Sequence, residues 1–208
     1  MWLFHLAFAV LCVVVLLAAR DQPGPALLAL TLGYNIGLPW VCSIIDDRDG
    51  LALWRFLLPL SVFMVLPDAF LAAHLGVLVF PDTGSPYLGP VPLFMAGLWV
   101  IPLFLIVRAG DRGGAAAAAL AALIIFTAAE ATLWAVPVWY AREVAQIGHV
   151  AVYLVVPETV LGVSTWLAWR ATRNSAPAAQ ALSAAAVMVF YLGNCALFWF
   201  LLESRNGL

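Results

Sequence analysis

The sequence predicts an all-α, polytopic transmembrane helical bundle of about seven spans, and three observations lead to this. Of the 208 residues, 65% are hydrophobic and 10% are charged, and the mean hydropathy is +1.05, far above that of a water-soluble domain. The apolar residues gather in runs of about 20 residues, the length of helix that crosses a bilayer core. Proline, glycine and charge interrupt these runs where loops are expected. Residues 1–208 are therefore expected to form one transmembrane helical domain.

The first expected element is a helix over residues 2–19. It resembles a signal peptide in length, but it has no basic n-region and is followed by "RDQPGP" instead of a small-x-small cleavage site. We therefore expect it to be retained as a span. The other spans are expected at residues 26–45, 51–67, 91–107, 115–136, 148–169 and 181–202.

Residues 51–80 are too long for one straight crossing, because a continuous helix of that length would extend about 45 Å. Pro67 is the expected bend, since proline suits the first turn of a new helix and Asp68 would lie near free backbone N–H groups. We therefore expect a Pro-kinked or interfacial helix at 67–80.

The arginines predict the orientation in the cell membrane. Six lie near the ends of even-numbered spans on one side and three lie on the other, which favours a cytoplasmic N-terminus for this multi-pass protein. The stretch "FPDTGSPYLGP" at 80–90 then faces outward. The two groups are Arg48, Arg55, Arg108, Arg112, Arg170 and Arg173 against Arg20, Arg142 and Arg205.

Composition excludes several functional classes. All nine basic residues are arginine, so a retinal Schiff base and any lysine nucleophile are excluded. With no basic cluster and no phosphate-binding glycine loop, no nucleic-acid partner is expected. Cys12, Cys42 and Cys195 form no CxxC pair and are interpreted as buried thiols, so no metal site and no cofactor are expected.

Three acidic residues are the candidate catalytic groups, because a carboxyl inside a span is costly and is usually paired or functional. Glu130 lies one to two turns inside the end of the fifth span, and Glu158 lies midway along the sixth, directly after a proline. Asp68 follows Pro67. The alternative for the two glutamates is a structural carboxyl bonded to a neighbouring helix, and for Asp68 a helix-capping charge.

Six further residues are candidate substrate contacts. Trp134 at i+4 shares the helical face of Glu130, and Trp99 is a possible cavity wall. Asp82 could instead close an Asx turn in "PDTG", and the histidines could be satisfied side chains in place of haem ligands. The six are Trp134, Trp99, Tyr87, His74, His149 and Asp82.

The stretch "PDAFLAAHLGVLVFPDTGSPYLGPVPLFMAGLWVIPLF", from Pro67 to Phe104, resembles the signature of a family of small multispan proteins of unknown activity in bacteria and photosynthetic organisms. The chain is also similar, in length, span number and tryptophan-rich spans, to seven-span integral-membrane terpene cyclases. That resemblance implies acid-driven cyclisation by an acid in an early span and one in the last span. The last span here, "LSAAAVMVFYLGNCALFWFLL", has no acid, so no catalytic residue is carried over.

Two functions are compatible with these observations. One is a membrane-embedded cyclase or isomerase acting on an isoprenoid or another lipid, with Glu130 as general acid and Asp68 or Glu158 as its partner or base. The other is a non-enzymatic membrane subunit, or a lipid- or pigment-binding protein, whose buried carboxyls are structural. Expected partners are the bilayer, a membrane lipid or isoprenoid, and a second copy or a larger membrane complex.

Overall fold

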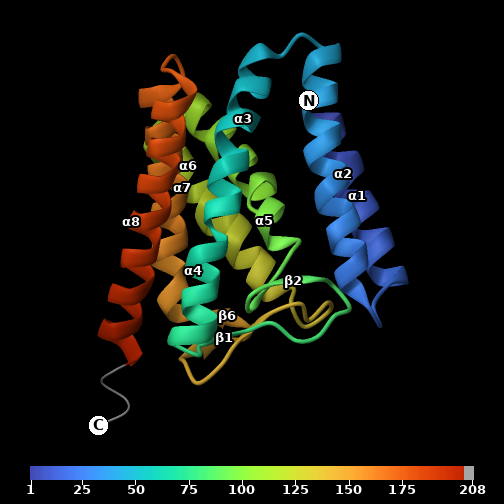
Figure 1. Ribbon diagram of the computed structural model, residues 1–208, viewed down its shortest axis with the longest axis vertical. Coiled ribbons are helices and arrows are strands. Elements are labelled where there is room, and N and C mark those ends of the chain that lie inside the picture. The colour runs from blue at the N-terminus through green and yellow to red at the C-terminus, as the bar shows by residue number, and fades with distance from the viewer. Residues whose placement is uncertain (204–208) are drawn as a thin grey trace.

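The computed structural model describes residues 1–203 as a bundle of helices with short loops at one end and three two-stranded ribbons at the other (Figure 1). This confirms the predicted all-α membrane-type fold. The helices are α1 Trp2–Ala18, α2 Pro23–Ile44, α3 Arg48–Phe63, α4 Val65–Ala69, the π-helix η1 Phe70–His74, α5 Met95–Leu98, α6 Val100–Ala131, α7 Val152–Thr172 and α8 Pro177–Glu203. The strands are β1 Leu78–Val79, β2 Tyr87–Leu88, β3 Val91–Pro92, β4 Tyr140–Ala141, β5 Gln146–Ile147 and β6 Val150–Ala151.

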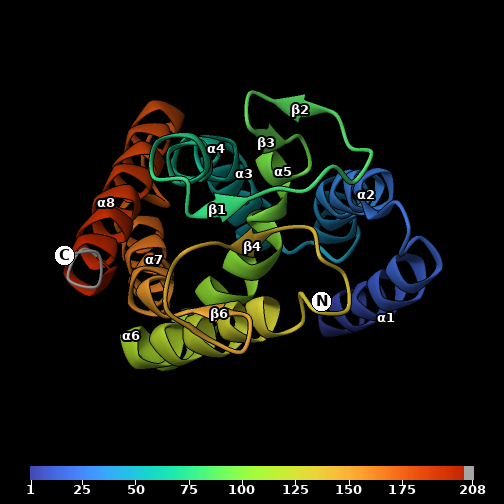
Figure 2. The same ribbon diagram turned by 90° about the horizontal axis from the view of Figure 1, so that it is seen from below.

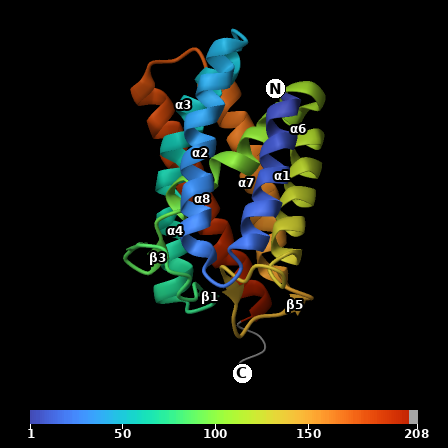
Figure 3. The ribbon, with the colours of Figure 1, turned by 90° about the vertical axis from the view of Figure 1, so that its right-hand side faces the viewer.

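Helix α6 doubles back on itself at Gly114, whose φ of 72° and ψ of −164° are not helical. A Cβ placed on Gly162 would lie 2.5 Å from the Cβ of Ala122 and 3.0 Å from Cγ2 of Ile106. In a straight helix, Ile106 and Ala122 would be about 24 Å apart along the axis. The segments before and after Gly114 therefore run antiparallel beside α7, as Figure 3 shows.

This reversal gives the chain seven passes along the bundle. Five helical segments are long and apolar enough to cross a membrane, residues 95–131 being one of them, and the shorter apolar α1 runs beside them. Because residues 95–131 fold back at Gly114, they supply two passes. The structure thus has the expected succession of seven apolar segments, and the number that cross a bilayer stays a prediction.

The third pass departs from expectation near Pro67. The helix continues beyond this residue through α4 and the π-turn η1 to His74, and residues 75–80 are not helical. Pro67 has no N–H for the carbonyl of Phe63, and the helix is interrupted between α3 and α4 at Met64. The bend thus lies one turn before Pro67, and the expected helix at 67–80 ends six residues early.

The fifth pass is also shorter than expected, because α6 ends at Ala131 where a helix to residue 136 was predicted. Pro137 disfavours helical backbone at Val136 and cannot donate to Leu133. As a result, residues 132–139 form a loop outside the helix.

Two loops far apart in sequence close the ribbon end of the bundle, as seen from below in Figure 2. Strand β1 pairs antiparallel with β4, with Leu78 opposite Ala141 and Val79 opposite Tyr140. The guanidinium of Arg142 donates to the carbonyl of Gly76 at 3.0 and 3.2 Å. The lid, defined as residues 75–94 and 132–151, is therefore held by hydrogen bonds between its two halves.

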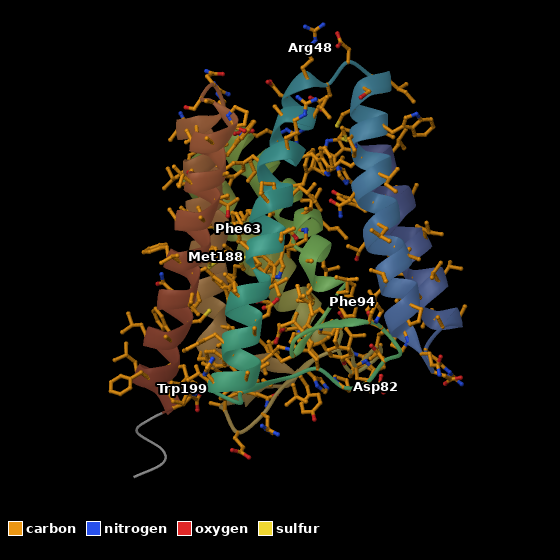
Figure 4. The ribbon with its side chains drawn as sticks, in the orientation of Figure 1. Arg48, Phe63, Asp82, Phe94, Met188 and Trp199 are labelled. Carbon is orange, nitrogen blue, oxygen red and sulfur yellow. The ribbon has the colours of Figure 1, made fainter. Side chains whose placement is uncertain are left out.

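The opposite end of the bundle carries most of the positive charge. Arg48 lies at this end and Asp82 at the lid end (Figure 4). Within residues 1–203, the six arginines of the first predicted group lie toward the former end, and Arg20 and Arg142 lie at the lid end. Arg205 lies outside the described residues. The arrangement matches the charge asymmetry on which the predicted cytoplasmic N-terminus rests, and the orientation itself stays a prediction.

Candidate functional site

A cavity of about 290 Å³ lies inside the bundle directly beneath the lid. Five passes and both halves of the lid contribute to its wall. Most of the wall is formed by apolar side chains, and only a few polar groups reach the cavity. The lining residues are Asp68, Leu71, Leu78, Phe80, Met95, Leu98, Trp99, Ile101, Pro102, Leu105, Ile125, Phe126, Ala129, Glu130, Trp139, Leu154, Glu158 and Tyr191.

The three acids predicted as catalytic groups meet in this cavity. Asp68 comes from α4, Glu130 from α6 and Glu158 from α7, with exposed fractions of 3%, 6% and 7%. No arginine or histidine is among the lining residues that the structure describes. Three ionised carboxylates would therefore have no positively charged side chain beside them among these lining residues.

Asp68 is held by the indole of Trp99, whose Nε1 donates to Oδ2 at 3.3 Å. Trp99 lies at the junction of α5 and α6, and its ring contacts those of Phe126 and Tyr191. The bond therefore ties the third pass to the fourth inside the cavity wall. Asp68 does not cap its helix through its side chain.

Glu130 is held by the lid, because Nε1 of Trp139 donates to its Oε1 at 2.8 Å. Glu130 lies in the last turn of α6, and the backbone N–H of Ala151 is a second neighbouring donor. Both donors belong to residues 132–151. The position of the lid and that of the Glu130 carboxyl are thus linked through the bond from Trp139.

Glu158 differs from the other two acids. Among residues 1–203, no group donates a hydrogen bond to its carboxyl. Its close electrostatic neighbours are Glu130 and Asp68, which have the same charge sign. The hydroxyl of Tyr153, five residues before it, is also buried, with no hydrogen-bond partner among residues 1–203. Glu158 is therefore the carboxyl in the cavity whose hydrogen-bonding capacity is unused.

Trp99 is the predicted substrate contact that the structure places in the cavity wall. Trp134 lies in the loop after α6 with 72% of its surface exposed, so Trp139 occupies the place beside Glu130 that was expected for Trp134. Nothing in the i+4 spacing could reveal this, because that spacing assumes that the helix continues past Ala131.

The other four candidate contacts lie on the outside of the lid end. Asp82 accepts from the backbone N–H of Gly84 at 3.0 Å, the Asx turn weighed above. The hydroxyl of Tyr87 donates to the carbonyl of Pro81 at 2.8 Å, and burial and the charge of Asp82 raise the pKa of Tyr87. His74 and His149 are exposed. None of the four lines the cavity, and their role as substrate contacts stays a prediction.

Sequence reasoning missed two polar groups of the cavity wall, Trp139 and Tyr191. Trp139 lies near the end of an expected span, a position typical of interfacial aromatic residues, so its place in the sequence does not mark it as part of a site. Tyr191 stands in the middle of an apolar span, which is a signal that a polar tip needs a partner. Its hydroxyl lies beside the thiol of Cys195.

A family model described as "Domain of unknown function (DUF6989)" matches residues 65–202. The chain belongs to this family. The DUF6989 region begins at α4 and includes every residue of the cavity wall, whereas α1, α2 and α3 precede it. This match agrees with the resemblance of the stretch from Pro67 to Phe104 to a multispan family of unknown activity. No curated protein and no solved structure matches the chain, so the resemblance to terpene cyclases has no support from these comparisons.

Proposed function

We propose that this membrane protein binds an apolar lipid or isoprenoid in the cavity and moves a double bond in it, or cyclises it, by proton transfer between carboxyl groups. The observation that carries the proposal is the meeting of Asp68, Glu130 and Glu158, from three passes, in one apolar space that no cation of residues 1–203 lines. Three buried negative charges at such a place would repel each other strongly. At least one carboxyl therefore retains a proton that it can donate.

The hydrogen bonds favour a division of roles that differs from the one expected from the sequence. Indole N–H donors to Asp68 and Glu130 stabilise the carboxylate form of each. Within residues 1–203 Glu158 has no such donor, and it shares the cavity with the other two carboxyls, so we take it as the group that holds the proton. We assign Glu158 as the proton donor and Glu130 or Asp68 as the base.

The reaction needs no oxidant or reductant. The O–H bond of Glu158 breaks as a C–H bond forms at one alkene carbon, which leaves a positive charge on the neighbouring carbon. A carboxylate then removes a proton from the adjacent carbon, and the electron pair of that C–H bond becomes the new double bond. For cyclisation, a second alkene of the same molecule attacks the cation first. Return of the proton from the base to Glu158 restores the site.

The aromatic wall fits a cationic intermediate. The faces of Trp99, Phe126 and Tyr191 attract positive charge, and the apolar remainder of the wall excludes water that would otherwise add to the cation. The two nearby carboxylates add electrostatic stabilisation.

Deuterium incorporation tests the proposal. Purified protein is incubated in D₂O with a lipid extract of its native membrane, and the isoprenoids and lipids are analysed by mass spectrometry. The wild-type protein should introduce deuterium at carbon, whereas Glu158→Gln should not, because the amide keeps the shape but supplies no labile acid proton. Glu143→Gln, at an exposed acid in the lid, is the matched control and should behave as wild type.

Absence of deuterium at carbon with the wild-type protein would overturn the catalytic proposal. Equal incorporation by Glu158→Gln would overturn the assignment of the donor. If a lipid co-purifies equally with wild type and Glu158→Gln but takes up no deuterium from either, the protein is the lipid-binding protein of the alternative interpretation.

A further inference from the structure

A second pocket, of only about 20 Å³, lies at the arginine end of the bundle, on the opposite side of the main cavity from the lid. It is lined by residues from α1 and from the first half of α6. Leu105 belongs to the walls of both cavities, so the small pocket and the main cavity adjoin there. The lining residues are Met1, Trp2, His5, Phe104, Leu105, Arg108 and Arg112.

The small pocket has an excess of hydrogen-bond donors. Arg108 donates from Nη2 to Asp47 at 2.7 Å, which leaves its other N–H groups available. Arg112 lies with its Cζ 4.8 Å from the centre of the Trp2 ring and has no acidic partner within residues 1–203. Nε2 of His5 is buried without a partner among residues 1–203, and it is a donor in the tautomer whose Nδ1 accepts from Tyr34. A ligand that accepts several hydrogen bonds and carries negative charge would satisfy these groups.

The distance between the two sites matches the length of an amphiphilic molecule. Arg108 and Trp99 are nine residues apart on one helical pass, which corresponds to about 14 Å along the axis. The intervening cavity wall is apolar and includes Leu98, Ile101 and Leu105. A hydrocarbon chain of that length, with its head at Arg108, would therefore reach the carboxyls.

Charge also fixes the direction in which such a molecule would bind. An anionic head is repelled by the three carboxyls at one end and attracted by two arginines at the other. The arginine end is the predicted cytoplasmic surface, where arginines near the ends of spans contact lipid phosphates.

We propose that the ligand of the main cavity is an amphiphile with an anionic phosphate head, held at Arg108 and Arg112, whose hydrocarbon chain passes Leu105 and reaches Asp68, Glu130 and Glu158. This inference rests on the proposed function and narrows its substrate class to a phosphorylated lipid or isoprenoid. The bond that reacts then belongs to the chain, far from the phosphate.

Binding of simple probes to the full chain in a neutral detergent tests this proposal. The probes are dodecyl phosphate, dodecanol, dodecyltrimethylammonium and inorganic phosphate, with affinity measured by native mass spectrometry. Dodecyl phosphate should bind at least about tenfold more tightly than dodecanol, and Arg112→Gln should remove most of that difference. Arg173→Gln, at an exposed arginine of the same end outside both cavities, is the matched control and should change nothing.

Arg112 is the better first target, because Arg108 is bound to Asp47 and its removal could unfold the helix ends. A second measurement does not depend on any arginine variant. A diazirine placed near the end of the alkyl chain of a phosphate amphiphile should crosslink to peptides that contain Trp99 or Glu130, and Leu105→Trp should abolish this crosslink.

Three outcomes would overturn the proposal. Equal affinity for dodecyl phosphate and dodecanol would exclude a site for the head, and equally tight binding of inorganic phosphate would show an anion site without a role for the chain. Preferential binding of dodecyltrimethylammonium that depends on Glu158 would show that the head enters the main cavity. Glu158→Gln should leave the affinity for dodecyl phosphate within about twofold, so failure of the chemistry and failure of the ligand class are distinguishable.

Discussion

The indole of Trp139 donates a 2.8 Å hydrogen bond from the lid to the carboxylate of Glu130 at the end of α6. The bond spans only nine residues of sequence, yet it joins an irregular loop to a buried acid in the cavity wall. The position of the lid and the orientation of this acid are therefore linked through one hydrogen bond. Loss of the indole N–H would affect both.

Trp139→Phe should lower the free energy of unfolding by about 1–3 kcal/mol, because a nearly buried carboxyl loses its closest side-chain donor. It should also reduce the deuterium incorporation described above. Thermal unfolding in detergent measures the first effect. The matched control is Trp134→Phe, at a tryptophan with 72% exposure, which should change neither quantity. The opposite ranking of the two variants would contradict the lid contact.

The Arg108–Asp47 ion pair should contribute measurably to stability. Asp47 accepts from Arg108 at 2.7 Å and also from the backbone N–H of Gly50 at 2.8 Å, where it caps α3. Asp47→Ala should cost about 2 kcal/mol, since it removes a helix cap and leaves a half-buried arginine without its partner. Arg48→Ala, which breaks the exposed pair with Asp46, should stay within about 0.5 kcal/mol. Chemical denaturation of both variants under the same conditions measures the two changes in the free energy of unfolding.

Gly114 should not tolerate a side chain. Its backbone, at φ 72° and ψ −164°, lies in a region that is accessible almost solely to glycine, so Gly114→Ala should cost about 1–3 kcal/mol. The control is Gly193→Ala inside α8, where an added Cβ meets nothing within 4 Å. That change should be neutral or stabilising by up to about 1 kcal/mol. A stable Gly114→Ala variant would indicate that α6 does not reverse at this residue.

Cysteine labelling in intact cells tests the orientation. With Cys12, Cys42 and Cys195 replaced by serine, a membrane-impermeant maleimide should react with Leu88→Cys in the lid and leave Ser175→Cys in the α7–α8 loop unlabelled. Both side chains are exposed, so access to the reagent depends on the side of the membrane alone. Labelling of Ser175→Cys without Leu88→Cys would place the lid in the cytoplasm.

Local sequence signals predicted the helices well where the signal was a run of apolar residues, and less well at proline. The segments on both sides of Gly114 were expected as separate spans, and the structure has them. Pro67 was expected to begin a helix that runs to residue 80, whereas α4 begins at Val65 and the helical backbone ends at His74. Proline fixes its own φ and removes one donor, and whether this bends or ends a helix depends on what packs against it.

The sequence by itself determined that this protein belongs in a membrane and in what order its apolar segments follow one another. It also singled out three acids, because burying an unpaired carboxyl in hydrocarbon is costly wherever it occurs. Only the tertiary structure decided that Asp68, Glu130 and Glu158 share one cavity and that Trp139 and Trp99 are the donors to two of them. Helical periodicity reports which residues share a face of one helix. The packing of several passes at once decides which helix faces meet across the bundle. It also decides where a loop such as the lid folds back.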